Sequence, residues 1–279
     1  MQGVLFLCIV ALTAAETIEE KKHLPHQNHE DVLRKLQENP KNPSHTMKEH
    51  HKSQVKSFSV ERGIEPKYLD CQEIFEKNST ASNGEYTIFT DPTKPGKKVY
   101  CDMSNKGWTL ILQRKMEKDI IFHQDFQMYE NGFGDIRNSY WLGNEFVHQL
   151  TKKNKYLLRV VFRTADGKFP FAEYDYFKLE DASLHYAIRL GSYTASTAED
   201  GFSSPVLENK VDNQPFSTSD KDNDLSPANC AAAFKTGWWF ADCHSSILTL
   251  PGYIKWQGTC DSETQICPYV KMMIRRNPV

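Results

Sequence analysis

The 279-residue sequence has no marked excess of charge of either sign. Its 34 basic and 36 acidic side chains are interleaved and give a formal net charge of −2. Nucleic-acid binding needs a basic stripe, and attraction to an anionic membrane surface needs a polybasic cluster. Both are missing, and no stretch beyond the N-terminus is apolar over the roughly 20 residues that a membrane-spanning helix needs. The composition therefore predicts no nucleic-acid partner and no membrane insertion.

Motifs that mark common enzymes and fibrous stalks are also missing. The chain contains no GxSxG, no HExxH and no phosphate-binding glycine loop. The adjacent Cys243 and His244 are the one tempting nucleophile and base, and a cysteine in a disulfide cannot attack a substrate. Heptads and Gly-X-Y repeats are absent, so neither a coiled coil nor a collagen stalk is indicated, although a homo-oligomer is an option. The sequence therefore predicts a protein that is not an enzyme.

The N-terminus carries the features of a secretory signal peptide. Residues 1–15 read MQGVLFLCIVALTAA, an apolar run followed by small residues of the kind that signal peptidase accepts. A buried N-terminal strand is the alternative. We therefore expect a secreted, extracellular protein, in which the sequon at Asn78 is available for N-glycosylation.

Cysteine usage agrees with an extracellular location. Cys8 leaves with the signal peptide, and an oxidising compartment favours pairing of the even set that remains. A zinc site is the alternative, but these cysteines lack the CxxC spacing that zinc sites use. Pairing between sequence neighbours predicts three disulfides: Cys71–Cys101, Cys230–Cys243 and Cys260–Cys267.

The chain changes character near residue 68. Residues 16–67 are polar, rich in histidine and interrupted by prolines, so we expect a largely disordered segment with one short helix at 31–38. Metal binding by its histidines is the alternative. Residues 68–279 hold most of the aromatic side chains and form one α+β domain whose loops carry function. The pattern predicts a helix at 141–150 and strands at 85–89, 98–101, 108–114, 156–162, 174–179 and 186–190.

Residues 213–244 are the most informative stretch for chemistry. Asp220, Asp222 and Asp224 alternate along a short turn, a concentration of like charge that a bound cation relieves. Calcium accepts such mixed oxygen ligands in loose geometry. An EF-hand is excluded, because Leu225 and Ala231 stand where that loop needs its glycine and its bidentate glutamate. A solvated acidic turn is the plain alternative.

A second cue follows the acidic turn. Cys230 and Cys243 bracket the adjacent Trp238 and Trp239, so a disulfide would pin the turn to an aromatic floor. This arrangement predicts a preformed concavity suited to ligand binding. The alternative is that both tryptophans belong to the core.

Several motifs in order resemble the fibrinogen C-terminal domain family, which includes fibrinogen chains, ficolins, angiopoietins and fibrinogen-like proteins. The similarity covers residues 68–276 and implies a central antiparallel sheet with a loop-rich calcium and ligand subdomain. It rests on DCQEIF at Asp70, VYCDM at Val99, GWTLILQR at Gly107, YENGFGD at Tyr129, YWLGNEFVHQLT at Tyr140, YDYFKL at Tyr174, FSTSDKDND at Phe216 and GWWFADCH at Gly237.

The resemblance implies roles for residues of the acidic turn. Asp222 and Asp224 would give side-chain oxygens to Ca2+, while Ser226 and Ala228 would give backbone carbonyls. Asp220 would lie just outside this ligand set.

The resemblance also implies a ligand pocket beside the calcium site. A cis peptide between Asp242 and Cys243 and the neighbouring His244 would hold an acetyl group, with Ala233 and Phe234 lining the pocket. A structural role for His244 is the alternative. Ala233 and Phe234 also differ from the acidic and polar residues of pockets that bind a cationic fibrin knob.

The sequence departs from the family after His244. Ile247 and Thr249 stand at positions where asparagines are usual, and the loop that follows is shortened. Two binding functions result. The first is a lectin of innate immunity that recognises acetylated carbohydrate. The alternative is a secreted signalling ligand that binds a protein receptor, as the resemblance to angiopoietin-like and fibrinogen-like proteins implies.

Overall fold

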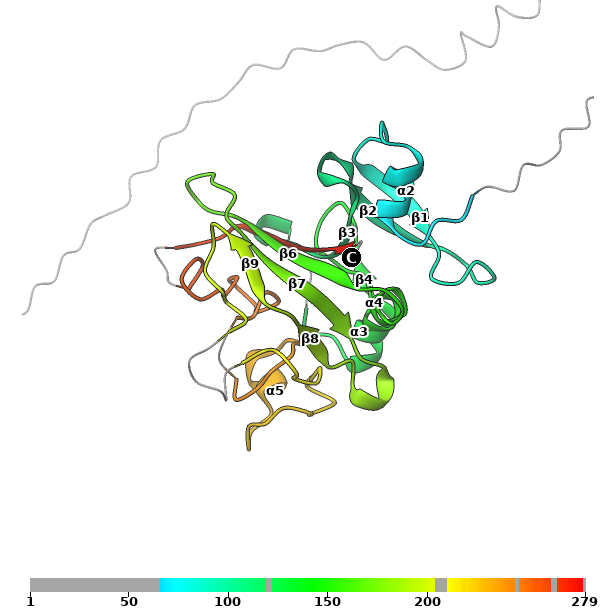
Figure 1. The fold of residues 1–279 in the computed structure, drawn as a ribbon. Helices are drawn as coiled ribbons and strands as arrows, with labels where there is room; N and C mark the ends of the chain where they lie inside the picture. The colour runs from blue at the N-terminus through cyan, green and yellow to red at the C-terminus, as the bar shows by residue number, and fades with distance from the viewer. Residues whose placement is uncertain (1–65, 119–121, 204–209, 244–245, 262–264, 278–279) are drawn as a thin grey trace, which may run out of the picture. The chain divides into compact units, whose positions relative to one another are not determined.

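An antiparallel sheet organises the part of the chain that the structure describes, namely residues 66–118, 122–203, 210–243, 246–261 and 265–277 of a computed structural model (Figure 1). The predictions for the signal peptide, the N-terminal helix and histidines, and His244 lie outside these residues. The described residues fall within one compact unit, Arg62–Val279.

The C-terminal strand lies in the middle of the sheet, between strands from the first half of the domain (Figure 1). Each recorded pairing between the described strands is antiparallel, as the resemblance implied. A short strand pair, β4 (Phe133–Gly134) and β5 (Tyr140–Trp141), joins β3, while β9 (Tyr193–Ser196) joins β7. The main order is β1 (Gly84–Ile88), β2 (Lys97–Asp102), β3 (Trp108–Lys115), β10 (Tyr269–Arg276), β6 (Tyr156–Arg163), β7 (Phe171–Leu179) and β8 (Ile188–Leu190).

All six predicted strands are present, with shifted ends. The largest difference is in β7, which begins at Phe171 instead of residue 174, and β8 begins at Ile188 instead of residue 186. His185 and Tyr186 both have a φ of 51°, a left-handed conformation that a strand cannot accommodate. The structure adds β10, which the sequence analysis missed even though Val270, Met272 and Ile274 are buried at alternate positions.

The predicted helix at 141–150 is confirmed as α4 (Asn144–Thr151), displaced by a few residues. Its start is later because Trp141 pairs with Leu112 as a strand and Gly143 has a φ of 109°. Within the described ranges, three further short α-helices were not predicted, and each is capped by the side chain that precedes it. They are α2 (Cys71–Lys77), α3 (Phe126–Asn131) and α5 (Cys230–Phe234), capped by Asp70, Asp125 and Asn229.

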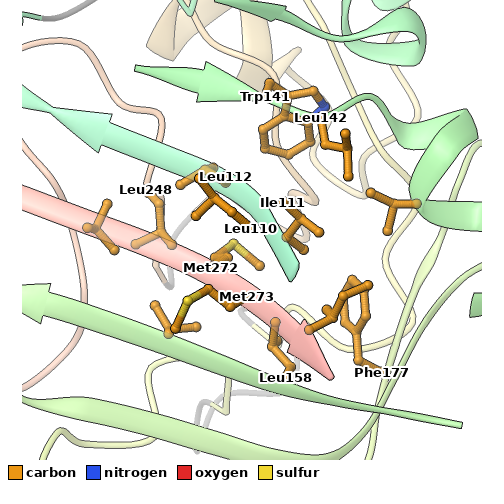
Figure 2. Packing of buried hydrophobic residues seen from close by; sticks show 14 of the residues in the cluster. Leu110, Ile111, Leu112, Trp141, Leu142, Leu158, Phe177, Leu248, Met272 and Met273 are labelled. Carbon is orange, nitrogen blue, oxygen red and sulfur yellow. The ribbon is translucent and has the colours of Figure 1, made fainter. Parts of the chain in front are cut away.

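The core lies against the central strands and includes side chains from distant parts of the chain. Figure 2 shows Leu112, Met272 and Leu248 close together beside Trp141. All three predicted disulfides are confirmed, with Cα–Cα distances of 5.4, 5.4 and 5.6 Å, in the order of their first cysteines. They join Cys71 to Cys101, Cys230 to Cys243 and Cys260 to Cys267.

Candidate functional site

The acidic turn is held by backbone N–H groups that donate to Asp224. Its Oδ1 accepts from the amide of Ser226 and its Oδ2 from the amide of Cys230, both at 3.0 Å. Asp222 is exposed and accepts from the amide of Asp224 at 3.4 Å. The two carboxylates therefore lie side by side on a turn that is already ordered by its own main chain.

The surroundings of Asp224 make its ionised form energetically unfavourable. Burial raises the pKa of Asp224, and the adjacent charge of Asp222 raises it further, against the lowering effect of the Cys230 and Ser226 amides. A divalent cation beside both carboxylates would remove that cost, because its positive charge favours the ionised form of each.

The residues present fit a calcium ion through a mixed set of oxygens. The described residues contain no group of three or more His, Cys, Asp or Glu side chains placed to share a metal. An ion here therefore depends on carbonyl oxygens, and the half-buried Ser226 and exposed Ala228 follow the carboxylate pair directly. Calcium accepts carbonyl ligands readily, whereas zinc favours thiolate and imidazole. The metal assignment of Asp222, Asp224, Ser226 and Ala228 stays a prediction.

Asp220, the third acid of the motif, has a different partner. Its Oδ1 accepts a hydrogen bond of 3.1 Å from the amide of Phe126, the first residue of α3. Lys221 lies over the ring of Phe126, with Nζ 3.9 Å from the ring centroid. Asp220 thus attaches the acidic turn to α3, consistent with a place outside the predicted ligand set.

The two tryptophans behind the turn belong to the core. Trp238 and Trp239 are each 1% exposed. Trp239 packs against Trp141 at 5.7 Å and against Phe216 at 5.2 Å between ring centroids. The backbone of Trp238 pairs with Ser217 just before the acidic turn. Both tryptophans are therefore core residues, as the alternative interpretation predicted. The same core lies behind the acidic turn.

The structure corrects one feature of the predicted pocket. The peptide bond between Asp242 and Cys243 is trans, so the expected cis bond is wrong, and Cys243 instead has a left-handed φ of 68°. Asp242 and Ala233 are exposed, while Phe234 stacks on Phe240 with 6.1 Å between ring centroids. These residues surround the end of α5 and the Cys230–Cys243 bond. Their ligand-binding role stays a prediction.

Residues 246–250, which follow the predicted pocket in sequence, are buried and do not line a surface. Ile247 is 1% exposed and Thr249 has no exposed surface. The Thr249 hydroxyl donates to the carbonyl of Gly237 at 2.9 Å, and the Thr236 hydroxyl donates to the carbonyl of Thr249 at 2.9 Å. This segment therefore closes the core beneath the tryptophans.

A buried arginine, Arg114, holds the segment that contains Ile247 and Thr249. Its role was not predicted from the sequence. Arg114, the penultimate residue of β3, donates through Nη1 to the carbonyls of Leu248, Leu250 and Tyr253. Its guanidinium also lies over the ring of Phe122, 5.6 Å from the centroid. No local signal identifies this role, because a charged residue at a strand end ordinarily points to solvent.

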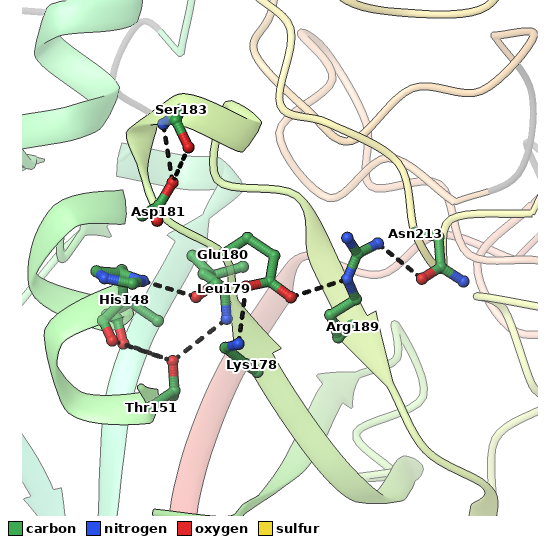
Figure 3. A network of polar contacts seen from close by, with 10 residues as sticks. His148, Thr151, Lys178, Leu179, Glu180, Asp181, Ser183, Arg189 and Asn213 are labelled. Atoms are coloured by element: carbon green, nitrogen blue, oxygen red, sulfur yellow. Dashed lines mark hydrogen bonds and ion pairs between the residues drawn. The ribbon is translucent and has the colours of Figure 1, made fainter. Parts of the chain in front are cut away.

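Residues 213–243 carry the candidate site, and a polar network attaches the beginning of this segment to the sheet (Figure 3). Glu180 receives hydrogen bonds or ion pairs from Lys178 at 2.7 Å and Arg189 at 3.1 Å. Arg189 then donates to the side-chain oxygen of Asn213 at 2.7 Å. The amide of Leu190 adds a bond of 2.8 Å to Asp212. Residues 213–243 thus start from a fixed point at β8.

Asn78, the predicted glycosylation site, lies at the end of α2 and is exposed. Its side-chain oxygen accepts from the amide of Thr80 at 3.2 Å and from the Thr80 hydroxyl at 2.7 Å. The acceptor amide is accessible in this turn, and glycan attachment stays a prediction. Among the described residues, no helix combines the length and apolar character needed to cross a bilayer.

Comparisons with known proteins agree with this architecture. A family model described as the C-terminal globular domain of fibrinogen beta and gamma chains matches residues 67–271. Human angiopoietin-4 is 39% identical over 184 residues, which cover 65% of this chain and 35% of that protein. The chain thus spans about a third of that relative. Chicken fibrinogen-like protein 1-like protein is 33% identical over 202 residues, covering 71% of this chain and 70% of that protein.

A solved structure gives the same result for the fold. The fibrinogen-like globe domain of human ANGPTL2 superposes with a TM-score of 0.65 and 31% identity. The match covers 76% of this chain and 100% of that domain. The resemblance inferred from the motifs and the expected α+β fold are confirmed.

Proposed function

Because the chain belongs to the fibrinogen C-terminal domain family, we propose that it is a secreted signalling ligand that binds a protein receptor through the surface around its acidic turn, residues 220–228. The relatives reported above are an angiopoietin, a fibrinogen-like protein and an angiopoietin-like globe domain. These are the classes for which the sequence resemblance implied receptor binding. They support the alternative interpretation of the sequence better than the lectin interpretation.

The observation that carries the proposal is the burial of Ile247 and Thr249. These residues stand where the family usually has asparagines, at the start of the shortened segment that follows the predicted acetyl-binding pocket. Their side chains instead lie in the core at 1% and 0% exposure, and the Thr249 hydroxyl donates to a backbone carbonyl. Side chains engaged in this way are not available to a sugar, which favours recognition by a broader surface.

The surface around the acidic turn suits a protein partner. Leu225 is 64% exposed between the carboxylate pair and α5, and its amide donates to the carbonyl of Ala241 at 3.1 Å. An apolar side chain on a pinned loop gives a partner an anchor to bury at little entropic cost. Calcium held by Asp222, Asp224 and the carbonyls of Ser226 and Ala228 would neutralise the acids beside this anchor.

A cell-binding assay with the purified, oxidised protein tests this function. We expect saturable binding that persists in excess N-acetylglucosamine and acetate, and that is lost on calcium chelation. Leu225→Glu should weaken binding at least roughly tenfold, because it places a charge at the buried centre of the contact. Ile266→Glu is the matched control, since Ile266 is 54% exposed outside residues 213–243. Displacement of the protein by acetylated sugar would instead establish the lectin function.

A further inference from the structure

A concave surface lies over the ends of β3 and β10, and residues of the acidic turn do not line it. The cleft has a volume of about 640 Å³, which is within the range of ligand-binding sites. None of its lining residues belongs to residues 213–243. We call it the β3–β10 cleft, and the side chains that carry the argument are Tyr100, Lys115, Glu117, Arg163, Phe169 and Tyr269.

The charges of the cleft leave a cationic surplus. Arg137 and Glu85 both line the cleft and neutralise each other in an ion pair of 2.8 Å. Of the other charged lining residues, Lys115 and Arg163 are basic and Glu117 is acidic, and the Lys115 ammonium donates to the carbonyl of Arg137. The guanidinium of Arg163 is exposed, and within the described ranges no ion pair occupies it. A free guanidinium in a concave site matches the planar geometry of a carboxylate.

The same cleft offers apolar and aromatic surface. Phe169 is 61% exposed on its rim, beside Pro268. At its floor, Tyr269 donates from its hydroxyl to the side-chain oxygen of Gln113 at 2.9 Å. Burial raises the pKa of Tyr269 and of Tyr100, so both phenols remain neutral. An aromatic ring entering the cleft would bury Phe169 and meet uncharged ring faces.

The rim is ordered before any ligand binds. The turn that carries Phe169 is closed by a bond from the amide of Thr164 to the carbonyl of Lys168 at 3.0 Å. The amide of Ala165 donates to the carbonyl of Ile266 at 3.1 Å, next to the Cys260–Cys267 bond. On the other side, the amide of Met116 donates to the carbonyl of Pro268 at 2.9 Å. A rim fixed in this way loses little entropy on binding.

We propose that the β3–β10 cleft binds a segment of a partner protein in which an acidic side chain lies beside an aromatic one. The acid pairs with Arg163, and the ring packs on Phe169 and Tyr269. A sulfated glycan satisfies the cations, but its hydroxylated and sulfated pyranose rings cover the apolar ring of Phe169 less completely than an aromatic side chain does, so the exposed ring favours a peptide. Gly84 and Glu85 of the edge strand β1 line one end of the cleft and place strand backbone beside an extended segment.

A synthetic peptide tests the proposal on the full-length protein. We expect the probe Ac-Glu-Phe-Glu-Phe-Glu-NH2 to shift the backbone amide resonances of residues around Gln113, Arg163 and Tyr269. Arg163→Gln and Phe169→Ala should each weaken its binding roughly tenfold, since each removes a central contact. Lys153→Gln and Tyr253→Ala are the matched controls, because both side chains are exposed outside the cleft.

Companion probes separate the two parts of the recognition. Replacing the acids with glutamine, or the rings with alanine, should weaken binding at least roughly fivefold in each case. Calcium chelation should leave binding unchanged, so this result is independent of the receptor proposal. Equal binding by wild type, Arg163→Gln and Phe169→Ala overturns the inference. Tighter binding of a heparin-derived hexasaccharide that depends on Arg163 but not on Phe169 overturns it as well, in favour of a glycan site.

Discussion

The guanidinium of Arg114 and the carbonyl oxygen of Leu248 lie 3.0 Å apart, although 134 residues separate them in sequence. Arg114 has no exposed surface, and it also donates to the carbonyl of Tyr253 at 3.1 Å. A buried cation is tolerated only where acceptors surround it. This contact therefore fixes the shortened segment after the candidate pocket to the end of β3.

We predict that Arg114→Met lowers the free energy of unfolding by about 3 to 5 kcal/mol. Methionine fills a similar volume but leaves several buried carbonyls without a donor. Urea denaturation with the disulfides intact measures the change. Lys153→Met, a cation-to-methionine change at an exposed site, should alter stability by less than about 0.5 kcal/mol. Equal effects of the two substitutions would contradict the assigned role of Arg114.

Local patterns in the sequence predict much of the sheet and its bridges. Burial alternates along β6 and β7, β3 is a continuous apolar run, and Cys230 and Cys243 are close enough in sequence to suggest their bond. The acidic motif is equally local. What these features share is that each depends on neighbours along the chain.

Features that depend on distant partners were not predictable in this way. The strand β10 pairs with β3 and β6, both more than a hundred residues earlier. Asp220 finds its partner at the amide of Phe126, 94 residues away. The left-handed φ of 68° at Cys243 was not predictable either, because this conformation is uncommon for residues other than glycine, asparagine and aspartate.

Substitutions of the three acids of the turn should affect calcium binding differently. We predict that Asp222→Asn and Asp224→Asn abolish calcium uptake in calorimetry, together with the rise in melting temperature that calcium produces in the wild type. Asp220→Asn should retain both, because Asp220 is engaged with the amide of Phe126 and asparagine still offers an acceptor oxygen. If Asp220→Asn loses uptake as fully as Asp224→Asn, the assigned ligand set is wrong. If the wild type takes up no calcium, the proposed metal role fails altogether.

Asp102 should contribute stability that disappears in acid. Burial acts to raise its pKa, but hydrogen bonds from Ser104 and Lys271 and the charge of Lys271 outweigh burial and hold the pKa below the usual range of an aspartate. A carboxyl group with a depressed folded pKa stabilises the protein above its unfolded pKa and loses this effect as the pH falls through the folded value. Asp102→Asn should therefore lower stability by about 1 kcal/mol at pH 7.

The pH dependence of that difference is the decisive measurement. The stabilities of wild type and Asp102→Asn should converge as the pH falls below the usual pKa of an aspartate and through the depressed pKa of Asp102. Asp166→Asn is the matched control. Hydrogen bonds from Lys168 and Thr164 lower the pKa of Asp166 to about 2, but its ion pair with Lys168 at 2.8 Å is exposed, so solvent and salt screen the pair and the stability of the variant should stay close to that of the wild type at each pH. A constant gap between wild type and Asp102→Asn across this range would contradict the pKa direction.

The Cys260–Cys267 bond should matter both for stability and for the β3–β10 cleft. It closes a loop with a sequence separation of 7, for which chain entropy predicts a contribution of about 2 kcal/mol. The double change to serine should lower the free energy of unfolding by that amount. Because the carbonyl of Ile266 accepts from the amide of Ala165 at the base of the Phe169 turn, amide hydrogen exchange should also accelerate at Ala165. The corresponding loss of the Cys71–Cys101 bond is the control, since it should destabilise the fold while leaving exchange at Ala165 slow under native conditions. Faster exchange at Ala165 in both variants would show that the effect is global and that the bond does not specifically order the rim of the cleft.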